Sequence, residues 1–116
     1  NSYKMASVDF LKKVALSFAE TQEAPHFEKT SFRIKNKIFA TYDSKENNAC
    51  LKLSIIDQHV FSSYNPIIFA PLPNKWGLQG WTIVNIALVA ESMLQDALQC
   101  AYNEVAPKKL RISSSV

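Results

Sequence analysis

Three strand-like segments follow one another between residues 31 and 54, and this run limits the possible folds more than any other feature of the chain. The segments cover residues 31–35, 38–42 and 50–54. In the first and third, apolar side chains alternate with basic or polar ones, which is the period of a half-buried strand. Because the connections at 36–37 and 43–48 are short and polar, we predict an antiparallel meander.

A helix is predicted before this run. Ser7 is a suitable N-cap for a helix that begins at Val8 or Asp9, and apolar side chains then recur at helical spacing as far as Phe18. The helix is expected to end before Pro25, which cannot continue it.

The other predicted elements follow the meander. They are a short helix over 57–64, strands over 67–70 and 81–86, and a closing helix whose apolar stripe runs from Met93 to Val105. The predicted order is therefore α-β-β-β-α-β-β-α. Strands grouped in runs favour a two-layer α+β fold, with a five-stranded antiparallel sheet covered by helices on one face.

The 116 residues are predicted to form a single domain, with a core over about 8–107 and flexible ends at 1–6 and 108–116. No apolar run approaches the roughly 20 residues that span a bilayer. We therefore expect no membrane partner and a cytoplasmic location. Cys50 and Cys100 form no C-x-x-C pair, which favours reduced, buried thiols.

Motifs of catalysis and metal binding are absent from the sequence. It contains no nucleophile elbow, P-loop, dinucleotide-binding pattern or zinc-protease pattern. The two histidines, His26 and His59, have no second ligand type at metal spacing. We therefore expect a protein without enzymatic activity, metal or cofactor.

Positive charge is concentrated in one part of the chain. Residues 29–52 carry six basic and two acidic side chains, a net charge of +4, in a chain whose total is +3. Alternation predicts Arg33 and Lys35 on one strand face, opposite the apolar residues, and Lys52 alternates in the same way with its leucine neighbours. If helices cover the apolar face, the open face is basic. Such a face either binds anions or is an ordinary solvated surface that protects strand edges.

Both tryptophans and both glycines of the chain fall within residues 74–81, the stretch NKWGLQGW. Between two predicted strands this stretch is a long hairpin loop that projects like a wing, and glycine permits backbone angles that other side chains forbid. Lys75 and Trp76 suit stacking on nucleic-acid bases, a protein interface, or packing of the loop itself. For Trp81, which begins a strand, core packing is the favoured interpretation.

Several short motifs in order along the chain carry a family resemblance. They are His26, the run Phe32-Arg33-Ile34-x-x-Lys37-Ile38-Phe39-Ala40, Leu51-Lys52-Leu53, Asn74-Lys75, Trp81 and Ala101-Tyr102. From about Val8 to Lys108 the chain resembles the MmcQ/YjbR-like family of small bacterial proteins. The resemblance implies the α+β fold described above and suggests DNA binding through two hairpin wings. By this analogy the matching positions are Lys37, Asn74, Lys75 and Trp81. Residues 76–80 make the second wing longer than in many members.

We therefore expect a non-enzymatic domain that binds double-stranded DNA through the phosphate backbone, with little sequence specificity. The expected contact residues are Arg33, Lys35, Lys37, Lys52, Asn74, Lys75 and Trp76. Two alternatives remain open. One is a protein-interaction module, including a homodimer, that uses the same face. The other is a small-ligand pocket near His26 and Trp81.

Overall fold

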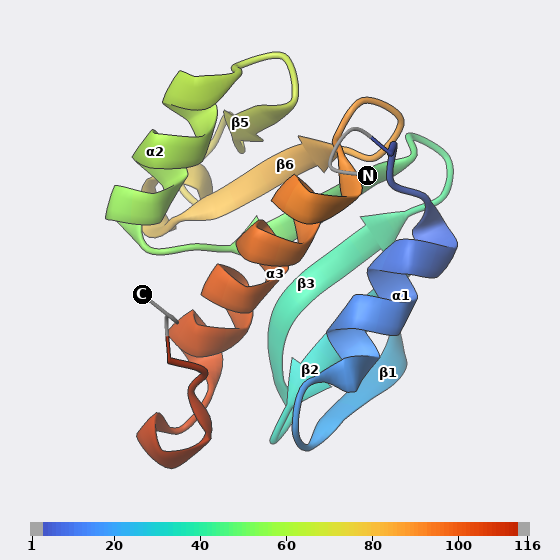
Figure 1. The fold of residues 1–116 in the computed structure, drawn as a ribbon, viewed down its shortest axis with the longest axis vertical. Coiled ribbons are helices and arrows are strands. Elements are labelled where there is room, and N and C mark those ends of the chain that lie inside the picture. Colours follow the sequence, from blue (N-terminus) through green and yellow to red (C-terminus); the bar gives the residue numbers. More distant parts are fainter. Residues whose placement is uncertain (1–3, 114–116) are drawn as a thin grey trace.

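The computed structural model describes residues 4–113, which form a six-stranded antiparallel sheet covered on one face by three helices (Figure 1). The elements are α1 (Val8–Ser17), β1 (Thr21–His26), β2 (Lys29–Ile34), β3 (Lys37–Asp43), β4 (Asn48–Lys52), α2 (Ile55–Tyr64), β5 (Phe69–Pro71), the short 3-10 helix η1 (Gly77–Gln79), β6 (Trp81–Asn85), α3 (Glu91–Val105) and a second 3-10 helix, η2 (Lys108–Leu110). The strand order is β1-β2-β3-β4-β6-β5. This arrangement confirms the predicted α+β class.

Strand β1 was not predicted from the sequence. The predicted sheet therefore has five strands, whereas the sheet in the structure has six. The first helix ends at Ser17, and the chain then pairs with β2 from Thr21↔Ile34 to His26↔Lys29. The sequence of β1, TQEAPH, shows no apolar alternation because an edge strand buries little side-chain surface. Pro25 is tolerated there because an edge strand has one side without a ladder partner.

Serine caps fix the starts of α1 and α2. Ser7 Oγ accepts a hydrogen bond of 3.1 Å from the Phe10 amide, and Ser54 Oγ accepts one of 3.0 Å from the Asp57 amide. Each cap satisfies a backbone donor that has no partner within its helix. The Ser54 cap places the start of α2 at Ile55, two residues before the predicted start.

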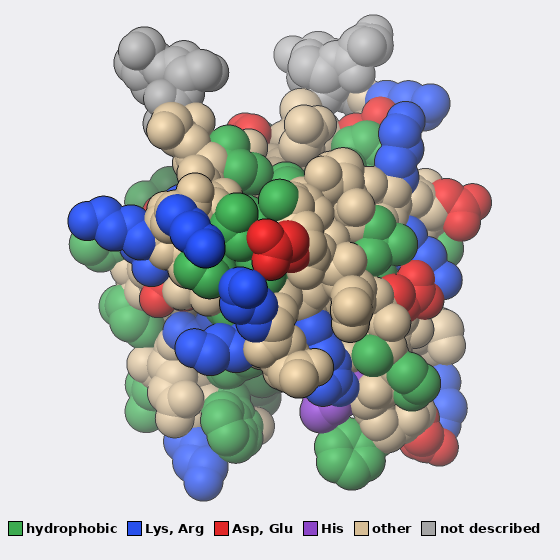
Figure 2. All heavy atoms as spheres, turned by 90° about the horizontal axis from the view of Figure 1, so that it is seen from below, with side chains coloured by type: hydrophobic (Ala, Val, Ile, Leu, Met, Phe, Trp, Pro, Cys, Tyr) green, Lys and Arg blue, Asp and Glu red, His purple; other side chains and the backbone are tan. Residues whose placement is uncertain are grey.

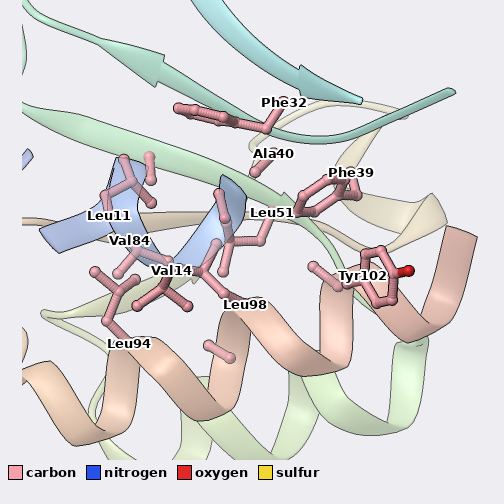
Figure 3. Packing of buried hydrophobic residues seen from close by; sticks show 14 of the residues in the cluster. Leu11, Val14, Phe32, Phe39, Ala40, Leu51, Val84, Leu94, Leu98 and Tyr102 are labelled. Carbon is pink, nitrogen blue, oxygen red and sulfur yellow. The ribbon is translucent and has the colours of Figure 1, made fainter. Parts of the chain in front are cut away.

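The hydrophobic core lies between the sheet and helices α1 and α3 (Figure 3). Helix α3 packs Leu94, Leu98 and Tyr102 toward β3 and β4, and α1 adds Leu11 and Val14. Burying each of these leucines contributes about 1.5–3 kcal/mol to the free energy of folding. The hydroxyl of the buried Tyr102 donates a 2.8 Å hydrogen bond to the Ala19 carbonyl, so its polar atom is satisfied.

A β-bulge decides which face of the sheet Ile38 occupies. The β2–β3 register changes from Phe32↔Ala40 to Arg33↔Ile38, which leaves Phe39 as the extra residue. Phe39 and Ala40 are both fully buried. With strict alternation, Ile38 would share the covered face with Ala40. The bulge instead places Ile38 on the open face.

The described ends of the chain are hydrogen-bonded to the domain, and the flexibility predicted for the ends stays a prediction. The Ala6 amide donates to the Val89 carbonyl at 2.8 Å. The Asn103 side chain donates to the Ile112 carbonyl at 2.8 Å and accepts from the Ile112 amide at 2.7 Å. Residues 1–3 and 114–116, which belong to the same prediction, lie outside the described residues. Among the helices of residues 4–113, none is long and apolar enough to cross a membrane.

Candidate binding site on the open sheet face

The face of the sheet opposite the helices carries a hollow of about 540 Å³. Figure 2 shows the molecule with this face pointing down, and the outline is indented there between two lobes. The floor of the hollow is formed by Thr41, Cys50 and Ile83 from the three central strands. The register pairs Thr41 with Cys50 and Cys50 with Ile83, so the three side chains lie side by side.

One side of the hollow, which we call the aromatic wall, consists of Ile38, Leu72, Trp76 and Trp81. Trp81 lies two residues before Ile83 on β6 and therefore on the same open face. It is not part of the core, so the interpretation of Trp81 as a core residue is wrong. The β-bulge supplies Ile38, and the β5–β6 connection supplies Leu72 and Trp76.

The other side, which we call the polar wall, consists of His26, Lys29, Asp43 and Asn48. Asn48 pairs with Asp43, and His26 pairs with Lys29 at the edge of the sheet. Glu46, in the β3–β4 turn, completes the rim. His26 and Trp81, which were predicted to lie near one pocket, both line this hollow.

The loop that carries Trp76 is held by its own hydrogen bonds. Asn74 Oδ1 accepts from the Trp76 amide at 2.9 Å, and the Asn74 carbonyl accepts from the Gly77 amide at 3.0 Å. The Trp81 amide donates to the Trp76 carbonyl at 3.1 Å. Asn74, predicted as a nucleic-acid contact, therefore shapes the backbone that presents the tryptophan.

The same loop is packed against the end of the sheet and does not project as the predicted wing. The antiparallel pairing of β5 with β6 confirms the hairpin. However, Gly77 and Gly80 are buried, and a Cβ atom on either would lie 1.9 Å from a backbone carbonyl oxygen, that of Leu72 or Leu53 respectively. Gly80 also has a φ of 105°, in the left-handed region. Both positions therefore require glycine.

Gln58 of α2 fixes the loop from the helix layer, a role that no sequence pattern indicated. Its buried Nε2 lies 3.0 Å from the Gly77 carbonyl, 3.2 Å from the Trp81 carbonyl and 3.1 Å from Thr82 Oγ1. Because an amide group has only two hydrogens, the three acceptors share them.

Three of the four predicted phosphate-binding cations on the sheet are engaged by protein groups. Lys35 pairs with Glu20 at 3.2 Å. Lys52 Nζ donates to the Gln79 carbonyl at 2.7 Å and lies 3.9 Å from Glu104. Arg33 is bound to neutral acceptors of β1 and β2, the Ser31 hydroxyl at 2.8 Å and the Pro25 carbonyl at 3.3 Å.

The remaining predicted cations are more accessible. Lys37 is exposed at the start of β3, and Lys75 Nζ lies 5.5 Å from the centre of the Trp76 ring. The prediction that Lys35 shares a strand face with Arg33 is wrong. Lys35 and Asn36 have φ values of 49° and 67° and form the turn, one residue earlier than the predicted Asn36-Lys37 turn.

The open face is therefore not a uniform basic surface. Its centre is apolar, and its rim combines Lys29 with the carboxylates Asp43 and Glu46. In the view of Figure 2, Lys and Arg side chains occur in both halves of the molecule, interspersed with apolar and acidic side chains.

The Cys50 thiol in the floor is not an activated nucleophile. Burial raises its pKa from 9.0 to about 11, although the Lys29 charge and a backbone hydrogen bond oppose the shift. The thiol therefore stays protonated at neutral pH. Within residues 4–113, no group of three His, Cys, Asp or Glu side chains is arranged to hold a metal ion.

A separate apolar surface lies on α2. Ile56, Val60 and Tyr64 recur at four-residue spacing and are all exposed. We refer to them as the α2 stripe. The expected interface with a second protein on the open sheet face remains a prediction.

Comparison with known proteins bears on the fold. No family model matches the chain, and no curated protein does. Among solved structures, Deinococcus radiodurans protein DR2400, with the family-model domain DUF419, matches at a TM-score of 0.77 and 22% identity, over 96% of this chain and 89% of that one. The two proteins share a fold. DUF419 is the MmcQ/YjbR-type family, so the neighbour has the fold that the resemblance implies.

Proposed function

We propose that the hollow in the open sheet face binds a small organic ligand, which was the third hypothesis from the sequence. The observation that carries this proposal is the combination of size and lining. A volume of about 540 Å³ lies within the range of small-molecule sites, roughly 300–1,000 Å³. Such sites combine an apolar interior with a few polar groups that orient the ligand, as the aromatic and polar walls do here.

The residues that line the hollow support binding of a ligand without catalysis. Cys50 is protonated at neutral pH, as its raised pKa requires. No hydrogen bond joins Cys50 to a histidine in the part of the chain that the structure describes. A thiol that is not hydrogen-bonded to a base lacks the usual means of activation.

The two tryptophans give a direct test, because both line the hollow and the chain has no others. A library of small aromatic and aliphatic compounds would be screened by tryptophan fluorescence and by NMR shifts of the Thr41, Cys50 and Ile83 amides. We expect some compounds to change both signals with a saturable dependence on concentration. If no compound changes either signal, the proposal is wrong.

A filling substitution provides the matched control. Thr41→Tyr places a bulky side chain on the floor, and Tyr is favourable in a strand. Gln22→Tyr adds the same side chain to β1, outside the residues that line the hollow. We expect only Thr41→Tyr to abolish binding while both variants keep the wild-type circular dichroism spectrum. Equal loss in both variants would contradict the proposed site.

DNA binding through the phosphate backbone is the second candidate, and one observation favours it. Lys29, Lys37 and Lys75 have no carboxylate within ion-pair distance among residues 4–113. If about three phosphates are neutralised, log K should fall with a slope near −2.7 against log salt, or about 40-fold between roughly 50 and 200 mM.

Anisotropy titration of a labelled random duplex tests this candidate. Lys37→Glu/Lys75→Glu should abolish binding, whereas Lys13→Glu/Lys109→Glu, which changes exposed residues outside the loop and the sheet, should weaken it less. Equal losses would indicate attraction by total charge only. Absence of binding at the lower salt concentration would exclude the candidate.

A further inference from the structure

We infer that the ligand of the hollow is a planar heteroaromatic ring of the nucleobase type, which contacts the tryptophans of the aromatic wall and hydrogen-bonds to the polar wall through its edge. This inference rests on the proposed function and specifies the class of ligand. It follows from the way in which the strand register separates the two kinds of lining.

The aromatic wall favours a flat aromatic ligand. Trp76 and Trp81 both line this side, and the Trp76 side chain is 48% exposed, so part of its indole surface has no protein neighbour. Aromatic side chains that retain exposed faces are the usual stacking surface for bases. Trp76 is also held by hydrogen bonds at its backbone, which reduces the entropy lost when a ring stacks on it.

The polar wall requires a ligand with donors and acceptors on one edge. Asn48 offers both a donor and an acceptor, Asp43 offers acceptors and Lys29 offers donors. No hydrogen bond of the Asn48 side chain is found within residues 4–113. A purely apolar ligand that covered these groups would remove their water without replacing its hydrogen bonds, which would weaken its binding.

Nucleobases meet both requirements. Their edges carry ring nitrogens, carbonyls and exocyclic amino groups, and amide and carboxylate side chains recognise these groups through paired hydrogen bonds. The base of a free nucleoside and the base of a single strand present the same edge and face. A paired base in a duplex is stacked and would have to leave the stack to enter the hollow.

Charge on the rim determines where a phosphate of such a ligand would lie. On this side of the hollow the two carboxylates of Asp43 and Glu46 outnumber the ammonium group of Lys29, so the net charge there disfavours an anion. Lys75 does not line the hollow, and its Nζ lies over the Trp76 ring, 5.5 Å from the ring centre. A phosphate attached to the base would therefore point out of the hollow toward Lys75.

Tryptophan fluorescence titration with four nucleosides, and with indole as a ring of similar size with a single donor, tests the class of ligand. We expect at least one nucleoside to bind ten times more tightly than indole. If indole binds and no nucleoside binds more tightly, the nucleobase inference is wrong, but the proposed small-ligand function stands. If neither indole nor any compound of the screening library binds, both are wrong.

Variants test the role of the polar wall. Asn48→Val removes the amide and keeps a strand-forming residue, and Gln22→Val removes an amide from the same face outside the hollow. Asn48→Val should weaken nucleoside binding about tenfold and leave indole binding unchanged, while Gln22→Val should change neither. If Asn48→Val weakens indole binding as much as nucleoside binding, the inference is wrong. If Asn48→Val does not fold, Lys29→Gln, at an exposed position, replaces it in the test. This variant too should weaken nucleoside binding and leave indole binding unchanged.

Short single-stranded oligonucleotides then distinguish the two sources of the base. A single strand that binds ten times more tightly than its nucleoside, with an affinity that falls as salt is raised, assigns the site to nucleic acid. Equal affinities assign it to free nucleosides or nucleotides. Both outcomes support the inference, whereas a duplex that binds more tightly than the single strand would contradict it.

Discussion

Lys52 Nζ donates a hydrogen bond of 2.7 Å to the carbonyl oxygen of Gln79, and so connects β4 to the loop that carries Trp76. Its ammonium group is therefore engaged in holding the loop. We therefore expect Lys52 variants to lose stability, whereas a phosphate contact would predict a loss of DNA binding.

Lys52→Met should lower the free energy of unfolding by about 1–3 kcal/mol, because it removes a charge-assisted hydrogen bond from a mostly buried side chain. Urea unfolding measures the change, and amide hydrogen exchange should show faster exchange at residues 77–81. Lys75→Met is the matched control. Its ammonium is exposed, and we expect a change within about 0.5 kcal/mol. Equal effects of the two substitutions would refute the assigned role.

Gln58→Glu should destabilise the protein in a pH-dependent way. The carboxylate would face the Gly77 and Trp81 carbonyls without hydrogens to donate, so its folded-state pKa should rise above the unfolded value of about 4.3. The loss of stability is then smallest below that unfolded value and grows as pH rises through it. Urea unfolding between about pH 4 and pH 8 measures this trend, with Gln58→Met, whose deficit should stay constant with pH, as the control.

Gly80→Ala should destabilise the protein by about 2 kcal/mol or more. The new Cβ would lie 1.9 Å from the Leu53 carbonyl oxygen, and the φ of 105° is unfavourable for alanine. Thermal unfolding should show the loss, and the tryptophan emission spectrum should change because the backbone beside Trp81 must move. Ser44→Ala, in the exposed β3–β4 turn, should leave both measurements close to those of the wild type.

Stability should fall as pH rises from about 9 toward 11, in part because of the cysteines. Burial raises the pKa of both Cys50 and Cys100 from 9.0 to about 11. As pH rises, the thiols of the unfolded chain therefore ionise before those of the folded protein. This difference favours unfolding in this pH window. A Cys50→Ala/Cys100→Ala variant should lose less stability over the same window, as measured by urea unfolding. An identical pH dependence would show that other groups cause the loss.

The elements that were predicted from the sequence are those whose own side chains indicate whether the segment is a helix or a strand. The Ser7 cap and the apolar spacing of α1, the alternation around Arg33 and Lys52, and the stripe of α3 are local signals, and the structure confirms these elements. Strand β1 was missed because it has no such signal. Its conformation depends on its partner β2.

The candidate site could be predicted only in part. His26 and Trp81 were predicted to lie near one pocket, and both line the hollow. Asp43, Asn48 and Ile83 were missed. Alternation along each strand shows which side chains share a face, but only the cross-strand register shows which of them are neighbours.

The sequence by itself determined the α+β class, the single sheet with helices on one face, and the β5–β6 loop, which with the first residue of β6 holds every tryptophan and glycine of the chain. Those features follow from caps, periodicity and turn residues, which act over a few positions. The tertiary structure decided that Lys52 and Gln58 hold this loop and that the bulge places Ile38 on the open face. Their positions depend on contacts between segments distant in sequence or on the pairing of strands, and no local pattern encodes such contacts.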